Sequence, residues 1–164
     1  MKKNILFVCT GNSCRSVMAE GLFKHLVTDQ ANEFLVGSAG AASMDGYPAS
    51  PETVRVMRDH GIDVSGHRSR KITAAMVRTA DKIFVMETMH KDAILRSWPE
   101  AGEKVHLLTE YSKDEFQKTL EIDIPDPIHM PDNFYDNVFQ VIRDCVTQIA
   151  QELGVKKLKE EEDV

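Results

Sequence analysis

Eight consecutive residues near the amino terminus combine a nucleophile with an anion-binding loop. The apolar run 4–8 leads into them, a helical pattern follows, and they read Cys9-Thr10-Gly11-Asn12-Ser13-Cys14-Arg15-Ser16. When a strand, a short loop and a helix follow one another in this way, the backbone N–H groups of the loop, here residues 10–15, can surround an anion at the positive end of the helix dipole. The same positive field favours the thiolate form of Cys9, and Arg15 offers a planar fork for two phosphate oxygens. The segment therefore predicts a thiolate that attacks a bound phosphate.

The phosphate-binding loop on this interpretation consists of Thr10, Gly11, Asn12, Ser13, Cys14 and Arg15. Within it, Arg15 takes part in the reaction together with Cys9. The simpler alternative is that Cys9 is a small residue buried at a strand end, as unpaired cysteines often are. The loop has no evident structural purpose, which favours the functional interpretation.

A phosphate ester reacts more readily when a general acid protonates its departing oxygen. Asp123, Asp126 and Asp132 precede the last helical pattern and are the candidates. Prolines flank Asp126 on both sides, and their restricted backbone would hold its carboxyl on an ordered loop. Asp126 is therefore the preferred acid, and an ordinary Asp-Pro turn is the alternative.

Strand and helix patterns alternate along the chain and must position these residues. Short apolar runs predict four strands, at 4–8, 34–38, 83–86 and 105–108. Periodic apolar spacing and capping residues predict four helices, at 17–29, 50–60, 88–97 and 132–153, with loops at 39–49 and 109–131. The alternation implies an α/β fold, a three-layer sandwich around a four-stranded parallel sheet.

The composition is that of one globular domain, placed at residues 1–155, with a charged tail at 156–164 that is expected to fray. A net charge of −6 without a basic stripe argues against a nucleic-acid partner. No apolar run approaches the roughly 20 residues of a membrane span, so neither a membrane segment nor a signal peptide is expected. Three cysteines without disulfide spacing fit a reducing cytoplasm.

Metal and cofactor chemistry is not expected, because the six histidines are scattered and no Cys/His cluster has ligand spacing. Cys145 falls on the apolar stripe of the last predicted helix, so we expect it to pack in the core rather than react.

Taken together, the motifs resemble those of the low-molecular-weight protein-tyrosine phosphatases. The matching residues are the segment 5–16, Met18-Ala19-Glu20, Gly37-Ser38-Ala39-Gly40, His60-Gly61-Ile62, His67-Arg68-Ser69-Arg70 and Asp126-Pro127. The similarity spans residues 3–153 and implies a flavodoxin-like sheet with the site at the carboxyl end of the first strand. The family activity implies a cysteinyl-phosphate intermediate on Cys9, with Asp126 first protonating the leaving group and then activating water. The implied partners are a phosphorylated protein or peptide as substrate, and phosphate or another oxyanion as product or inhibitor.

Further roles follow from the resemblance. Asn12 tolerates a left-handed backbone, and the family pattern implies that Ser38 contacts its side chain. Ser16 is expected to donate a hydrogen bond to the Cys9 thiolate. Cys14 could trap an oxidised Cys9 as a reversible disulfide, or it could be a small loop residue without that role.

Several positions depart from the eukaryotic tyrosine-phosphatase pattern. Ser13 stands where a larger aliphatic residue is typical, and protein-arginine phosphatases of bacteria carry Thr there, so Ser13 points modestly to phosphoarginine. Ile128 and His129 follow Asp126-Pro127 where tyrosine-directed relatives place aromatic rings. With Tyr47, they form the expected substrate rim, although for His129 a solvated residue at the rim is favoured over contact with substrate.

Two bracing positions also differ, since Val17 replaces a common Pro and Glu87 replaces a usual Asp. Both leave the chemistry intact and put the bracing of the loop in question.

Two other functions remain open besides a tyrosine- or arginine-directed phosphatase. Thioredoxin-coupled arsenate reductases have a similar loop, but they need further reactive cysteines, and this chain has Met86 and Met89 in the relevant stretch. A route through Cys9, Cys14 and an external thiol stays possible. A non-catalytic phosphate-binding module would not need Cys9, Arg15 and Asp126 together.

Overall fold

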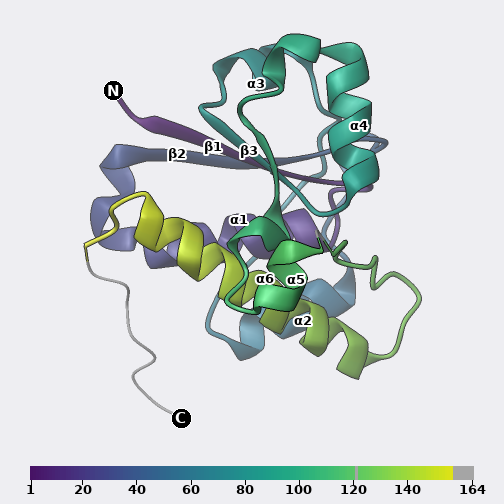
Figure 1. Ribbon diagram of the computed structural model, residues 1–164. Helices are drawn as coiled ribbons and strands as arrows, with labels where there is room; N and C mark the ends of the chain where they lie inside the picture. Colours follow the sequence, from purple (N-terminus) through teal and green to yellow (C-terminus); the bar gives the residue numbers. More distant parts are fainter. Residues whose placement is uncertain (121, 157–164) are drawn as a thin grey trace.

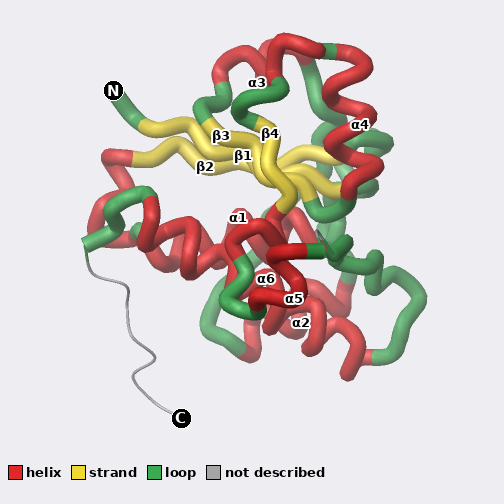
Figure 2. Tube along the Cα trace, viewed as in Figure 1, coloured by secondary structure: helices red, strands yellow, loops and turns green. Residues whose placement is uncertain are grey.

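Four parallel strands form the centre of the computed structural model, which describes residues 1–120 and 122–156 (Figures 1 and 2). The spatial order is β2-β1-β3-β4. The strands are β1 (Lys3–Cys9), β2 (Phe34–Gly40), β3 (Lys82–Val85) and β4 (Val105–Leu107). The α-helices are α1 (Arg15–Leu26), α2 (Pro51–Asp59), α3 (Ala74–Thr79), α4 (Thr88–Ser97), α5 (Glu115–Thr119) and α6 (Asp132–Glu152). Three short 3₁₀ segments complete the described elements, η1 (Thr28–Glu33), η2 (Pro99–Ala101) and η3 (Leu108–Tyr111).

Helices cover both faces of the sheet, as Figure 1 shows with α3 and α4 on one side and α1, α2, α5 and α6 on the other. Alternate residues of β1 supply the two halves of the core, because successive strand side chains point to opposite faces. Ile5 and Phe7 pack in the cluster that contains α1 and α6. Leu6 and Val8 pack in the cluster that contains α3 and α4. The expected three-layer sandwich with a parallel sheet is confirmed.

The helices that the sequence predicts best have clear end signals. Ser50 caps α2 by accepting a hydrogen bond from the Thr53 N–H at 3.2 Å, and Pro51 occupies the first turn. Gly61 follows with φ of 74°, a left-handed conformation that glycine adopts without strain. The long amphipathic stripe near the carboxyl end forms α6, whose bounds differ from the prediction by one residue.

Other elements differ from the prediction. Helix α1 ends at Leu26 rather than near 29, and the next residues form η1. The short helices α3 and α5 were not predicted, since five or six residues are too few to show a helical period. Strand β2 continues to Gly40, which also forms an isolated bridge with Lys71. The predicted frayed tail lies outside the described residues except for 156.

The sheet gathers the candidate residues at one edge, because the carboxyl ends of parallel strands lie together. Cys9 pairs in register with Gly40 of β2, and Val8 pairs with Val85 of β3. The loops that follow β1, β2 and β3 therefore meet at this edge.

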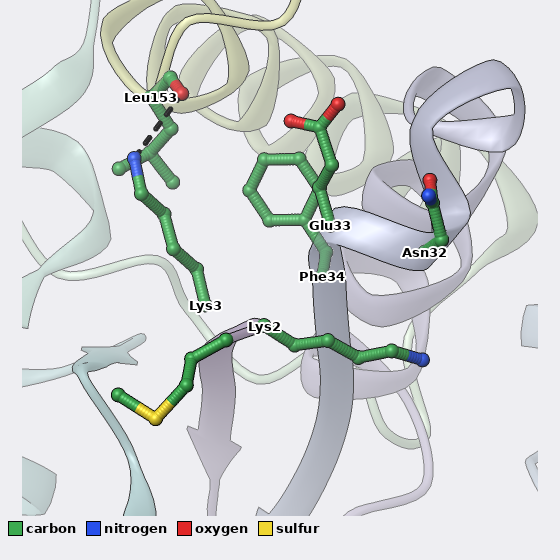
Figure 3. Close-up of a pocket in the computed structure, with 7 residues that line it drawn as sticks. Lys2, Lys3, Asn32, Glu33, Phe34 and Leu153 are labelled. Atoms are coloured by element: carbon green, nitrogen blue, oxygen red, sulfur yellow. Dashed lines mark hydrogen bonds between the residues drawn. The ribbon is translucent and has the colours of Figure 1, made fainter.

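The opposite end of the sheet carries a pocket of about 370 Å³ that is lined by the first three residues, by 32–34 and by Leu153 (Figure 3). Lys3 Nζ donates to the Leu153 carbonyl there at 3.5 Å. Neither the motif residues nor a nucleophile lies in this pocket. Within residues 1–120 and 122–156, no helix combines the length and the apolar character needed to cross a membrane.

Candidate active site

Cys9 ends β1 with its thiol buried beneath the loop that leads into α1. Its Sγ lies 3.0 Å from Ser16 Oγ. The Asn12 side-chain amide donates to the same Ser16 oxygen at 2.8 Å. Because Ser16 accepts from Asn12, its own proton is free to donate to the sulfur. The expected contact between Ser16 and Cys9 is present, and its polarity stabilises a thiolate.

Asn12 holds the loop in shape from its centre. Its φ is 52°, a left-handed conformation that asparagine adopts more readily than most residues. Its buried amide also donates to Ser38 Oγ at 2.9 Å, which is the expected contact with Ser38. Its side-chain oxygen accepts from the Arg70 N–H at 2.9 Å, and its carbonyl accepts from His67 Nε2 at 2.8 Å. The contacts of Asn12 thus tie the loop to α1, to β2 and to the segment 67–70.

Arg15 begins α1 and is 1% exposed, which makes it the largest fully buried side chain of the described residues. Its Nη1 donates to Glu87 Oε2 at 2.8 Å and to the Ile124 carbonyl at 2.7 Å. Its Nε is buried without a hydrogen-bond partner among the described residues. A buried unsatisfied donor carries a free-energy cost that an anion bound there would remove. The edge of the guanidinium that bears Nε and Nη2 is therefore the one suited to two oxygens of a phosphate.

Asp126 lies on the same side of Arg15, with Oδ2 3.5 Å from Nη2. Its other oxygen accepts from the Ile128 N–H at 3.1 Å, which fixes the carboxyl within the turn. The Asp126 side chain is 41% exposed, so a leaving group or a water can reach it. Nearby, the Ile124 N–H donates to the Met86 carbonyl at 2.9 Å and anchors this loop to the end of β3. The acid candidate is thus held by a local turn and by the sheet.

Ser13 and Cys14 complete the loop before α1. The Ser13 carbonyl accepts from the Ser50 N–H at 3.1 Å, which joins the loop to the start of α2. Cys14 Sγ is buried, 3.3 Å from Ser50 Oγ and 3.9 Å from the Tyr135 hydroxyl. Burial, with Cys14 beside it, raises the pKa of Tyr135 to about 12, so this hydroxyl keeps its proton. Cys9 and Cys14 are both free thiols.

The rim residues are exposed. Tyr47 is 57% and Ile128 46% exposed, and His129 adopts a left-handed backbone with φ of 64° at the tip of the acid loop. The loop of Tyr47 is fixed by the Ser69 N–H, which donates to the Tyr47 carbonyl at 2.7 Å. Tyr47 and Ile128 thus belong to loops that follow β2 and β4, at the edge of the sheet where Cys9 lies.

Cys145 is fully buried in α6, as predicted. Burial raises the pKa of its thiol to about 12, with Asp144 contributing to the same direction. A thiol that stays protonated is a poor nucleophile. Cys145 therefore lacks the properties that a disulfide relay requires.

Several residues outside the predicted site hold its loop in place. His67 and Arg70 fix Asn12, a role that their sequence motif does not indicate by itself. Glu87, whose bracing role was questioned, does contact Arg15. His90 contacts Thr10 Oγ1 at 2.8 Å, and no local pattern around position 90 signals that contact, because 80 residues separate the two.

Comparisons with known proteins place this chain among phosphatases. A sequence model described as low molecular weight phosphotyrosine protein phosphatase matches residues 4–162. The probable low molecular weight protein-tyrosine-phosphatase EpsP of Ralstonia nicotianae is 36% identical over 143 residues, which cover 87% of this chain and 90% of EpsP. The crystal structure of the tyrosine phosphatase Wzb from Escherichia coli, in complex with sulphate, has a TM-score of 0.82 and 33% identity, covering 94% of this chain and 100% of Wzb. A Cys-to-Ser mutant of the YwlE arginine phosphatase, with a phosphorylated active-site serine, has a TM-score of 0.83 and 29% identity, covering 92% of this chain and 95% of YwlE.

Proposed function

The chain belongs to the low molecular weight phosphotyrosine protein phosphatase family, and from that premise we propose that Cys9, Arg15 and Asp126 carry out its reaction. Members of this family are cysteine-dependent phosphoric monoester hydrolases. The observation that carries the residue assignment is the unpaired, buried Nε of Arg15 beside the Cys9 loop. Its neighbour Nη1 is saturated by Glu87 and Ile124, so the remaining edge is oriented for an anion.

In the first step, the Cys9 thiolate attacks phosphorus and forms an S–P bond, while the bond between phosphorus and the ester oxygen breaks. Asp126 donates its proton to the departing oxygen. Arg15 and the backbone N–H groups of residues 10–15 stabilise the charge on the equatorial phosphate oxygens. Ser16 Oγ lies 3.0 Å from the sulfur, where its proton can stabilise negative charge on the attacking atom.

In the second step, Asp126 removes a proton from a water that attacks phosphorus. The S–P bond breaks, phosphate leaves and Cys9 returns to the thiolate form. The partial exposure of Asp126 supports this role, because both the leaving group and the water must reach the carboxyl. The phosphorylated active-site serine of the YwlE mutant supports a phosphoenzyme at the nucleophile position.

The substrate is a phosphorylated protein or peptide, and phosphotyrosine is the first candidate. Tyr47 and Ile128 offer exposed apolar surface at the edge of the site for an aromatic ring. Phosphoarginine is a second candidate, favoured by the small hydroxyl of Ser13. Ser13 Oγ lies 3.6 Å from Cys14 Sγ, and serine is smaller than the aliphatic residue typical of this position in the eukaryotic tyrosine phosphatases. The similarity to YwlE, an arginine phosphatase, is in keeping with this second candidate.

Arsenate reduction is a weaker candidate, because Cys145 is buried with a protonated thiol and only Cys9 and Cys14 remain near the loop. We also propose that the protein works in the cytoplasm, in a reducing environment that suits three free thiols. Phosphate and similar oxyanions are expected to inhibit it by occupying the loop, as sulphate is bound to Wzb.

Hydrolysis of para-nitrophenyl phosphate tests the residue assignment. We expect Cys9→Ser to abolish turnover and Asp126→Asn to slow it by roughly 10²–10⁴-fold, the range typical of general acids. When Asp126→Asn reacts with a substrate that has a good leaving group, rapid quenching of the reaction should trap a phosphoenzyme. Full turnover by Cys9→Ser would refute the nucleophile.

Matched phosphotyrosine and phosphoarginine peptides of one sequence test the substrate. The ratio of their kcat/KM values gives the preference, and Ser13→Ile is expected to shift that ratio towards phosphotyrosine. Ser13→Thr is the control, because it keeps the hydroxyl. If Ser13→Ile and Ser13→Thr leave the ratio equally unchanged, Ser13 has no part in substrate selection.

A further inference from the structure

His90 is a fully buried histidine whose two ring nitrogens both have a hydrogen-bond partner, one of them in the phosphate-binding loop. The Glu87 backbone N–H donates to Nδ1 at 3.1 Å. Nε2 lies 2.8 Å from Thr10 Oγ1. A nitrogen that accepts a hydrogen bond carries no proton, so the neutral ring must hold its proton on Nε2. His90 therefore donates to Thr10, and Thr10 Oγ1 accepts.

Thr10 Oγ1 has a second donor nearby. Arg15 Nη2 lies 3.5 Å from it, on the side of the guanidinium that also faces Asp126. A hydroxyl oxygen has two lone pairs and one proton. With His90 and Arg15 directed at the lone pairs, the proton of Thr10 must point elsewhere. Thr10 follows Cys9 directly and is partly exposed in the loop. A donor in this place suits an anion bound over the sulfur.

We propose that His90 is a positioning residue for the phosphatase reaction: its Nε2–H holds the Thr10 hydroxyl as a donor to an oxygen of the bound phosphoryl group. This inference rests on the proposed function of the Cys9 loop and adds two residues to it. Thr10 contributes through its side chain, beyond its backbone N–H, and His90 acts through Thr10. The reaction is expected to be faster with this contact, because a preoriented donor needs no reorganisation when charge develops on the phosphoryl oxygens.

The surroundings of His90 keep the ring neutral. Burial lowers its pKa, and the positive charge of Arg15 on α1 lowers it further. Glu87, Asp123 and Asp126 act in the opposite direction, from the start of α4 and from the acid loop. Glu87 Oε2 is 3.6 Å from Nε2, yet it is already engaged by Arg15 at 2.8 Å. A protonated ring would also place an N–H against the Glu87 N–H, which two donors cannot share.

Nuclear magnetic resonance of the ring nitrogens tests the tautomer directly. In the wild-type protein, we expect the ¹⁵N shifts of His90 to show protonated Nε2 and unprotonated Nδ1 at neutral pH, and to stay so below the ordinary histidine pKa of 6.5. A ring protonated on Nδ1, or a ring charged at neutral pH, would overturn the proposal. This measurement needs no variant to fold.

Two pairs of substitutions test the effect on the reaction. Thr10→Val removes the hydroxyl and Thr10→Ser keeps it. His90→Asn keeps an acceptor for the Glu87 N–H and removes the donor to Thr10, whereas His90→Gln places an amide N–H near the Nε2 position. We expect roughly tenfold losses of kcat/KM for Thr10→Val and His90→Asn, as for one hydrogen bond to a charged group. The Thr10→Ser and His90→Gln variants should stay within about threefold of wild type.

The double variant Thr10→Val/His90→Asn distinguishes positioning from general damage. If His90 acts through Thr10, kcat/KM of the double variant falls no further than that of Thr10→Val alone. Losses that multiply to roughly a hundredfold would refute the coupling. The inhibition constant for inorganic phosphate should rise in parallel with the loss of activity.

A control histidine separates stability from positioning. His106 lies on β4 with Nδ1 3.4 Å from Glu110 and contacts none of the loop residues named here. His106→Asn is expected to leave kcat/KM unchanged. The proposed function fails if Cys9→Ser retains activity, whereas the present inference fails if Thr10→Val or His90→Asn retains full activity in an enzyme that Cys9→Ser inactivates.

Discussion

Replacing Asn12 should lower both stability and activity. Asn12 stabilises the fold in two ways, through its side-chain hydrogen bonds and through its tolerance of a left-handed backbone, and two different variants separate these contributions. Asn12→Ala removes three side-chain hydrogen bonds, to Ser16, Ser38 and the Arg70 N–H. Each is worth about 1 kcal/mol net, and the buried partners left behind raise the cost. Alanine at φ of 52° adds about 1 kcal/mol of backbone strain. The expected loss in free energy of unfolding is about 3–5 kcal/mol.

Asn12→Gly is the matched control, because it loses the same hydrogen bonds without the strain. We therefore expect Asn12→Gly to be more stable than Asn12→Ala by about 1 kcal/mol. Urea denaturation followed by far-ultraviolet circular dichroism measures both free energies. Hydrolysis of para-nitrophenyl phosphate under native conditions should be strongly reduced in both, since the loop that Asn12 supports carries the anion-binding N–H groups.

Two results would contradict this reasoning. If Asn12→Ala lost less than about 1 kcal/mol, the buried hydrogen bonds would not be stabilising the loop. If Asn12→Gly were less stable than Asn12→Ala, the left-handed conformation would not be the one adopted in solution. Asn12→Asp adds a third comparison, because it keeps an acceptor for Arg70 but cannot donate to Ser16 or Ser38.

Ser16, Gly40 and Cys145 each allow a further test. Ser16→Ala should slow alkylation of Cys9 by iodoacetamide at neutral pH and lower kcat/KM by roughly tenfold, because the donor to the sulfur is lost; an unchanged alkylation rate would contradict this. Gly40→Ala would place its Cβ 2.7 Å from the Thr10 carbonyl oxygen and 2.5 Å from Ser43. We therefore expect its free energy of unfolding, measured by urea denaturation, to fall by about 1–3 kcal/mol. Gly102→Ala is the control and should show no such loss, because the nearest atom to its Cβ is 3.7 Å away. Burial raises the pKa of Cys145 from 9.0 to about 12, so the unfolded chain loses this proton at a lower pH than the folded protein. The free energy of unfolding therefore falls as pH rises above 9, and this group contributes about 1.4 kcal/mol per pH unit to the fall. Cys145→Ala should reduce that slope without affecting activity, and an equal slope in both proteins would contradict the assignment.

The sequence predicted the elements whose signals are local. The apolar run of β1, the caps of α2 and the stripe of α6 each lie within one stretch of chain, and the structure confirms them. The helices α3 and α5 were missed, because elements this short depend on contacts with the rest of the fold more than on their own periodicity. The loop 10–15 was also predicted from a local signal, because its strand, turn and helix patterns follow one another directly along the chain.

The sequence by itself determined which groups could do chemistry here: a cysteine at a strand end, an arginine at a helix start and an aspartate between two prolines. Only the tertiary structure decided how these groups are held. The Glu87 carboxylate and the Ile124 carbonyl occupy one side of Arg15, His67 and Arg70 fix Asn12, and His90 donates to Thr10. These partners lie between 55 and 109 residues away from the groups they hold. Hydrogen bonds act over about 3 Å in space, whatever the separation along the chain, so the fold must bring the partners together before their roles can be seen.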